Sequence, residues 1–262
     1  MNSSAVSCKK LFGTSLLSTA YFPPVEYFAA IANSRRVLVE KCEIFQKQSY
    51  RTRCHIYGAN GLLSLSVPVL RGEAENAAGA VVDEVACSAL HTHKLLIDSV
   101  RIDYSKPWVQ QHSRAMDAAY MTTPFYEYYR DDIMAILTSG EENLFNLNYR
   151  LLELFCELIG LSADIGFTQE WKSSETVCSF SSGVIAGIDD DDLLSGRELV
   201  DFRSTIHPKY KGENLLQRLK IERPYYQAFS NKGGFIGNLS ILDLLCNEGP
   251  NSISFLKRRD SL

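Results

Sequence analysis

The sequence predicts an α/β domain with a mixed, mostly parallel sheet, and three observations support this fold class. The first ordered stretch reads as strand, helix, strand, the β-α-β unit that builds a parallel sheet when its crossover is right-handed. An Asn-Gly turn at residues 60–61 separates two strand-like runs and indicates a β-hairpin. An apolar stripe over residues 144–161 indicates a long amphipathic helix in a layer that covers the sheet. For the strand order, a Rossmann-like arrangement is our working guess.

Length and composition bound the class of protein. The chain has 262 residues, and we expect residues 1–262 to form one domain. The net charge of -4, from 27 Lys and Arg against 31 Asp and Glu, argues against a nucleic-acid partner. No apolar run reaches the roughly 20 residues of a membrane span. Seven widely spaced cysteines without a Cys-x-x-Cys pair are typical of reduced thiols in a cytoplasmic protein.

The opening elements follow from apolar runs and from the proline pair at residues 23–24. Residues 16–22 read as a buried strand, which the prolines end while favouring the first turn of a helix over residues 25–33. A second short strand is expected at residues 37–39. The hairpin strands then flank the turn at residues 58–61.

Further elements complete the α/β pattern. Strands are expected at residues 95–102 and 165–171. Helical spacing of apolar residues predicts three helices, at residues 107–121, 125–137 and 144–161. Residues 239–245 predict a short core helix capped by Asn238 or Ser240.

Residues 172–220 differ in composition from the rest of the chain. They are rich in Ser, Asp and Gly, with four consecutive aspartates at residues 189–192. The aspartate run lacks the alternate spacing and central glycine of a calcium loop. Such a segment buries little apolar area to offset chain entropy, so we expect it to be flexible and dispensable for folding.

The densest group of reactive side chains lies at residues 43–55, between the second strand and the hairpin. Its candidate residues are Gln46, Lys47, Tyr50, Arg51, Arg53 and His55. Arginine and lysine at the strand-end crevice of an open α/β sheet suit a phosphate or a carboxylate. We therefore expect the side chains of Gln46, Lys47, Arg51 and Arg53 to line one pocket there. The alternative is a solvated loop with one hydrogen-bonded, structural histidine.

Histidines elsewhere give weaker signals. His91 and His93 lie two residues apart with Cys87 nearby, but zinc needs three or four ligands, so we assign no metal site. His112 lies one helical turn after Trp108, and both a core role and a catalytic role are open for it. Because the sequence has no Gly-x-Gly-x-x-Gly fingerprint, phosphate loop or Gly-x-Ser-x-Gly elbow, the cofactor is unknown.

Five motifs in order carry a family resemblance. They are residues 20–28 (AYFPPVEYF), 46–53 (QKQSYRTR), 65–69 (LSVPV), Trp108 with His112, and 238–249 (NLSILDLLCNEG). Together they resemble the WbqC-like protein family over nearly the whole chain, apart from the N-terminal dozen residues and the Ser- and Asp-rich segment. The sequence departs from the usual family pattern at Thr19-Ala20, Glu26 and Thr52 and lacks a Tyr-Leu-Ser-Gly-like stretch, which points to a divergent branch or a different ligand.

The resemblance implies a context of bacterial surface-polysaccharide (O-antigen-like) biosynthesis. The function it suggests is a transferase, such as one that moves an amino-acyl (glycine) group to a sugar, with a nucleotide sugar or an activated amino acid as small-molecule substrate. The expected substrate-binding residues are Tyr21, Gln46, Lys47, Arg51, Arg53 and Asp243, and the expected proton-transfer residues are His55 and His112. The alternative is a noncatalytic small-ligand or partner-binding protein of the same pathway.

Two expectations concern how other elements join this site. Asp243 lies among aliphatic residues of the closing helix, and a buried carboxylate needs a hydrogen-bonded partner, for which we expect Arg51 or Arg53. The helix that follows the proline pair is expected to direct its N-terminus at a phosphate.

Overall fold

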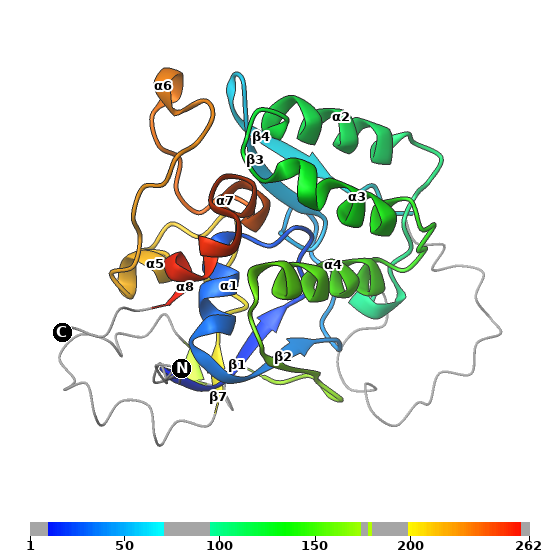
Figure 1. The fold of residues 1–262 in the computed structure, drawn as a ribbon. Coiled ribbons are helices and arrows are strands. Elements are labelled where there is room, and N and C mark those ends of the chain that lie inside the picture. Colours follow the sequence, from blue (N-terminus) through cyan, green and yellow to red (C-terminus); the bar gives the residue numbers. More distant parts are fainter. Residues whose placement is uncertain (1–9, 71–94, 174–177, 180–198, 258–262) are drawn as a thin grey trace, which may run out of the picture.

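The computed structural model describes residues 10–70, 95–173, 178–179 and 199–257. Its main sheet has five parallel strands in the order β5-β2-β1-β7-β6 (Figure 1). The strands are β1 Phe12–Ser18, β2 Ser34–Glu40, β5 Asp164–Phe167, β6 Cys178–Ser179 and β7 Leu199–Asp201. The predicted α/β class and the mostly parallel sheet are confirmed.

The chain opens with the predicted β-α-β unit, formed by β1, α1 (Val25–Ala32) and β2. All eight residues of α1 are buried, because apolar side chains surround this helix. β1 lies earlier than expected, since residues 19–22 turn away from the sheet. There the Tyr21 N–H donates to the Tyr50 carbonyl at 2.8 Å. Phe22 next to it is fully buried with φ at 42°, a conformation that bulky residues rarely adopt.

The strand order locates the point where the chain changes direction within the sheet. In chain order the strands lie as 3-2-1-5-4, so the first three follow the 3-2-1 order of a dinucleotide-binding half. The last two lie in exchanged positions on the other side of β1. The topological switch point therefore lies between β1 and β7.

The hairpin of β3 (Arg53–Gly58) and β4 (Gly61–Ser66) forms a separate antiparallel sheet, as predicted. The strand expected at residues 95–102 is wrong. This stretch holds a 3-10 turn, η1 (Ile97–Ser99), and makes only isolated bridges. Ile97, Val100 and Ile102 are buried, but η1 packs on α4 instead of joining a ladder, so apolar content imitated a strand.

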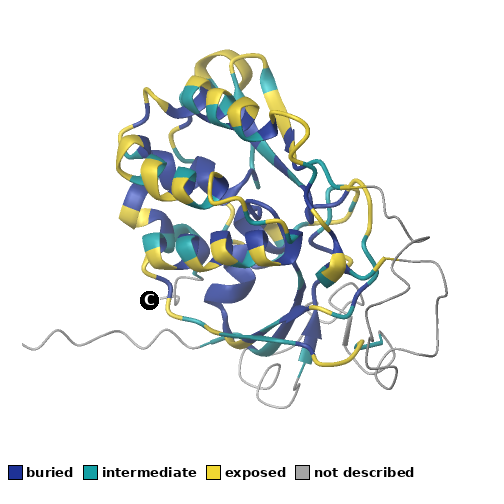
Figure 2. Ribbon diagram, turned by 90° about the vertical axis from the view of Figure 1, so that its right-hand side faces the viewer, coloured by how far each residue is buried: buried dark blue, intermediate teal, exposed yellow. Residues whose placement is uncertain are grey.

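Along the chain, three helices follow the hairpin and precede β5. They are α2 (Trp108–Tyr120), α3 (Tyr126–Leu137) and α4 (Leu144–Ile159), close to the predicted ranges. The α4 helix begins where the Asn143 side chain accepts the N–H of Asn146 and ends at Gly160, whose φ is 72°. Figure 2 shows the three helices with buried inner faces and exposed outer faces. None of the helices in the described ranges is long and apolar enough to cross a membrane.

The C-terminal part closes the core. It holds α5 (Leu215–Arg218), α6 (Ser230–Gly233), α7 (Ile241–Glu248), η2 (Gly249–Ser252) and α8 (Ile253–Leu256). The predicted core helix is confirmed as α7, which Ser240 caps and which packs on α1, α3 and β3.

The predicted flexible segment 172–220 is described only in part. Its described end supplies β7, which pairs with both β1 and β6 and buries Val200 and the adjacent Phe202. It also supplies α5. Residues 180–198, with the aspartate run, lie outside the described residues, so their flexibility stays a prediction. His91, His93 and Cys87 lie outside the described residues as well.

Candidate functional site

The switch point between β1 and β7 marks the candidate site, because open α/β sheets bind ligands outside the carboxyl ends of the strands at this point. Ser18 ends β1, and Asp201 ends β7. Glu40, which ends β2, is the register partner of Ser18. Three neighbouring parallel strands therefore end in polar side chains at one edge of the sheet.

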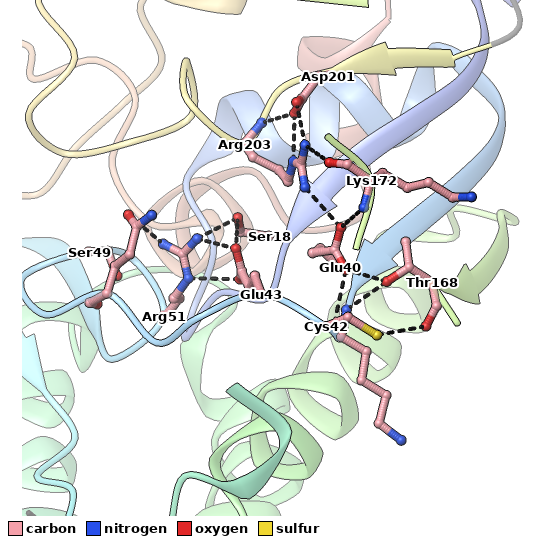
Figure 3. Close-up of polar contacts among 12 residues, drawn as sticks. Ser18, Glu40, Cys42, Glu43, Ser49, Arg51, Thr168, Lys172, Asp201 and Arg203 are labelled. Atoms are coloured by element: carbon pink, nitrogen blue, oxygen red, sulfur yellow. Dashed lines mark hydrogen bonds and ion pairs between the residues drawn. The ribbon is translucent and has the colours of Figure 1, made fainter. Parts of the chain in front are cut away.

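A buried ion pair lies directly beyond β1. The Arg51 guanidinium donates from Nε to Glu43 at 2.7 Å and from Nη2 to the same carboxylate, and it also donates from Nη2 to Ser18 Oγ at 2.8 Å (Figure 3). Both charged side chains are only 3% exposed. The Ser18 hydroxyl donates to the second Glu43 oxygen at 3.0 Å. This arrangement fixes the Ser18 hydroxyl between a carboxylate and a guanidinium.

Burial perturbs the Glu43 carboxyl. It raises the pKa of Glu43, and the hydrogen bonds from Arg51 and Ser18 oppose that rise. Perturbed carboxyl groups at a strand-end crevice are typical of proton-transfer sites, although structural ion pairs also produce them. Glu43 is thus a candidate proton acceptor for a ligand hydroxyl group that takes the place of the Ser18 hydroxyl.

A second buried network lies on the other side of Ser18. Arg203 bridges Glu40 on β2, at 2.9 Å, and Asp201 on β7, at 2.7 Å and 3.0 Å. It also donates to the Lys172 carbonyl at 2.7 Å. Because β1 lies between β2 and β7, Arg203 reaches across the end of the central strand (Figure 3).

A small cavity lies beside the Arg51 network. Its volume of about 10 Å³ is room for roughly one water molecule. The residues that line it come from the ends of β1 and β7 and from the loop before the hairpin: Leu17, Ser18, Thr19, Ala20, Tyr27, Tyr50, Arg51, Phe202 and Ile206. A larger ligand would therefore lie outside this cavity and reach it with one small group.

His207 joins the site from the loop after β7. It is half-buried, and burial first, then the charges of Arg51 and Lys209, lower its pKa. The Lys209 N–H donates to its Nδ1 at 3.1 Å, which leaves the proton of the neutral ring on Nε2 as a donor. Sequence reasoning missed Ser18 and His207 and gave no role to Glu43, which begins the reactive stretch 43–55, because the pairing of side chains from separate segments depends on the fold.

The structure brings together only part of the predicted basic cluster. Arg51 lines the cavity, and its Nη1 lies 3.5 Å from Gln46 Oε1. Lys47 is exposed on the same loop. Arg53 lies on β3 instead, where its Nε is 3.4 Å from Ser66 Oγ. Of the four residues expected in one pocket, only Arg51 lines this cavity, so the shared pocket stays a prediction.

Tyr21 and His112 form a buried pair within the core. The Tyr21 hydroxyl lies 2.8 Å from His112 Nδ1, and the ring also hydrogen-bonds to the backbone of Ser66. Burial lowers the pKa of His112 to about 4, so the ring is neutral at pH 7. Trp108 packs edge-on against it with ring centroids 5.2 Å apart. These contacts hold the His112 ring in place in the core, and its predicted part in proton transfer stays a prediction.

His55 lies on β3, half-buried, with the Tyr50 ring 5.8 Å from its own. Burial first and the charge of Arg53 second lower its pKa, so it too is neutral at pH 7. Its predicted role in proton transfer stays a prediction.

The prediction that an arginine pairs with Asp243 is wrong. The carboxylate is buried, as predicted, but it accepts from the Tyr225 hydroxyl at 2.7 Å and from Gln227 Nε2 at 2.8 Å. Arg51 pairs with Glu43 instead. Neutral donors leave the carboxyl without a countercharge, and burial raises its pKa. Asp243 thus holds α7 to the segment before α6.

The N-terminus of α1 does not receive a phosphate as expected. The Val25 N–H donates to the Leu239 carbonyl at 2.9 Å, and the Glu26 N–H donates to Asn238 Oδ1 at 3.0 Å. The buried Glu26 carboxylate accepts from Asn238 and from the Leu215 N–H. Protein groups therefore occupy this helix end.

Comparison with known proteins identifies the family. The model of the WbqC-like protein family matches residues 19–255. The chain belongs to the WbqC-like protein family. This WbqC-like chain is 22% identical, over 244 residues, to the uncharacterized protein Rv1507c of Mycobacterium tuberculosis, covering 92% of this chain and 96% of that protein. No solved structure matches the chain.

Proposed function

We propose that this WbqC-like protein is a transferase of bacterial surface-polysaccharide biosynthesis that binds a small, anionic, activated donor at the switch point. The observation that supports it is that Ser18 and Arg51 line the cavity beyond β1 and that Glu43 hydrogen-bonds to both of them. Transfer of an amino-acyl group, such as glycine, to a sugar suits a site that combines a fixed hydroxyl position with a proton acceptor and a guanidinium.

Some charged groups at the site pair within the protein, and others remain for a ligand. Arg51 is held by Glu43 through Nε and Nη2, so only its Nη1, beside Gln46, faces a ligand in this proposal. Lys47, exposed on the same loop, supplies a positive charge without a buried countercharge. These groups would hold a phosphate or a carboxylate of the donor.

The remaining groups would act on the reacting atoms. Glu43 would accept the proton of the acceptor hydroxyl, because burial raises the pKa of this carboxyl and so makes the carboxylate a stronger base. The acceptor oxygen would bond to the acyl carbon while the bond from that carbon to the activating group breaks, and the activating group would leave as an anion. His207 would hydrogen-bond from Nε2 to the acyl oxygen that gains negative charge. Glu43 contacts Arg51 directly, and the charge of Arg51 lowers the pKa of His207, so both would act near the guanidinium.

Ligand-dependent stabilisation tests the binding step. Nucleotide sugars, nucleoside triphosphates and amino acids are titrated while the melting temperature is followed, since a ligand at one hundred times its Kd adds about 2.7 kcal/mol. Lys47→Ala should weaken binding of the stabilising anion. Lys232→Ala is the matched control, because Lys232 is exposed on α6, which projects away from the sheet (Figure 1).

Turnover separates an enzyme from a binding protein. With the ligand identified, a labelled amino-acyl donor and a sugar nucleotide acceptor are incubated with the wild type and with His207→Asn. An enzyme should lose rate in the variant while it keeps its affinity. Absence of any transfer by the wild type, with binding intact, supports the noncatalytic alternative and refutes the transferase.

A further inference from the structure

Trp171 is a large apolar side chain held in an exposed position. It follows β5 by four residues and is 46% exposed. The Arg203 guanidinium lies over one face of its ring, with Cζ 4.4 Å from the ring centroid. Because a cation covers one face of this exposed indole, the ring has a defined orientation at the surface.

The cation that supports the ring is itself immobile. Arg203 is only 8% exposed, and two carboxylates, Glu40 and Asp201, together with the Lys172 carbonyl accept its N–H groups. These acceptors belong to β2, β7 and the segment after β5. The ring is therefore fixed against three parts of the sheet edge, which lowers the entropy that a ligand must lose on binding to it.

This ring lies at the same edge as the proposed donor site. Arg203 contacts Glu40, and Glu40 is the register partner of Ser18, whose hydroxyl contacts both Glu43 and Arg51. Neighbouring strands lie about 4.8 Å apart, so one strand spacing separates Glu40, which holds Arg203, from Ser18, which contacts Arg51.

We propose that Trp171, supported by Arg203, is a stacking platform for the base of a nucleotide whose phosphates bind near Lys47 and Arg51. This inference rests on the proposed function and names the substrate class of the same site. A planar base stacks on indole largely by dispersion, which the cation beneath leaves intact. That cation instead draws electron density from the ring face and weakens attraction for sugar C–H groups or for ammonium groups.

The ligand is a mononucleotide and not a nucleic acid. A protein that binds a polynucleotide backbone needs a positively charged groove, whereas this chain has a net charge of -4. The site also carries three carboxylates, Glu40, Glu43 and Asp201, beside its two arginines. Lys47 and the Nη1 group of Arg51 are the positive groups left for phosphates, which suits one nucleotide and not a polynucleotide backbone.

Fluorescence provides a direct readout because the chain has two tryptophans. Trp108 is 2% exposed in the core, so a stacked base should change only the emission of Trp171. Uridine diphosphate and adenosine diphosphate are titrated against the full chain, with inorganic pyrophosphate as the probe that lacks a ring. The nucleotides should quench the emission and bind about tenfold or more tightly than pyrophosphate, within the range expected for one stacked base.

Variants separate the platform from the anion site. In Trp171→Ala, both nucleotides should fall to the affinity of pyrophosphate, the remaining Trp108 emission should not respond, and Trp171→Phe should recover part of the affinity. Equal binding of nucleotide and pyrophosphate by the wild type overturns the platform and leaves the proposed anion site standing. Failure of nucleotides and pyrophosphate alike to bind overturns the platform together with the proposed anion-binding site.

Discussion

The buried, neutral His112 makes the stability of the protein depend on pH in a defined window. In the unfolded chain its pKa is near 6.5, and in the folded protein burial lowers it to about 4. Between these values the unfolded state binds the proton more strongly, so stability is fully present above pH 6.5 and is lost as pH falls. The two pKa values give a loss of about 2 kcal/mol by pH 5 and about 3 kcal/mol by pH 4.

Urea unfolding of the wild type and of His112→Asn, from pH 4 to pH 8, isolates this contribution. The variant lacks the titrating ring, so the difference in free energy of unfolding between the two proteins should shrink by these amounts as pH falls. Buried carboxyls with raised pKa values, such as Glu43 and Asp243, titrate in both proteins and cancel from the difference. His55→Asn is the matched control, and its half-buried ring should give a smaller change. A difference that stays constant from pH 8 to pH 4 refutes the buried pairing of His112 with Tyr21.

Three further substitutions test the packing, each by urea unfolding at pH 7. Glu43→Gln should lower the free energy of unfolding by about 3–5 kcal/mol, because it leaves Arg51 buried without a countercharge, and adding Arg51→Met should restore part of the loss. Asp243→Asn should cost about 1–3 kcal/mol, since a neutral amide oxygen is a weaker acceptor for Tyr225 and Gln227 than a carboxylate and the NH2 group adds a buried donor, and an unchanged midpoint would contradict the contacts described. Gly249→Ala should cost about 1–3 kcal/mol, because φ is 55° and a Cβ would lie 2.6 Å from the Phe125 ring; a neutral result would show that the ring can move.

Several elements were predictable because their signals are local. The α4 helix carries its apolar stripe, its Asn143 cap and its Gly160 stop within one stretch of sequence, and the hairpin carries its Asn-Gly turn. The stretch at residues 95–102 shows where this reasoning fails. Burial alone favours any compact conformation, and a ladder requires a neighbouring strand that the sequence does not display.

The sequence by itself determined the β-α-β opening, the helical layer, the core helix α7 and the choice of residues 43–55 as the region from which Arg51 comes. Tertiary structure alone decided the partners of these groups. Strand β7 has three residues and little local signal, yet its place beside β1 creates the switch point, and the loop after it places His207 where the charge of Arg51 lowers its pKa. The pairing of Trp171 with Arg203 likewise joins residues from two separate strand ends. Hydrophobic periodicity records which face of an element is buried, but contacts between distant segments depend on strand order and register, which no single segment encodes.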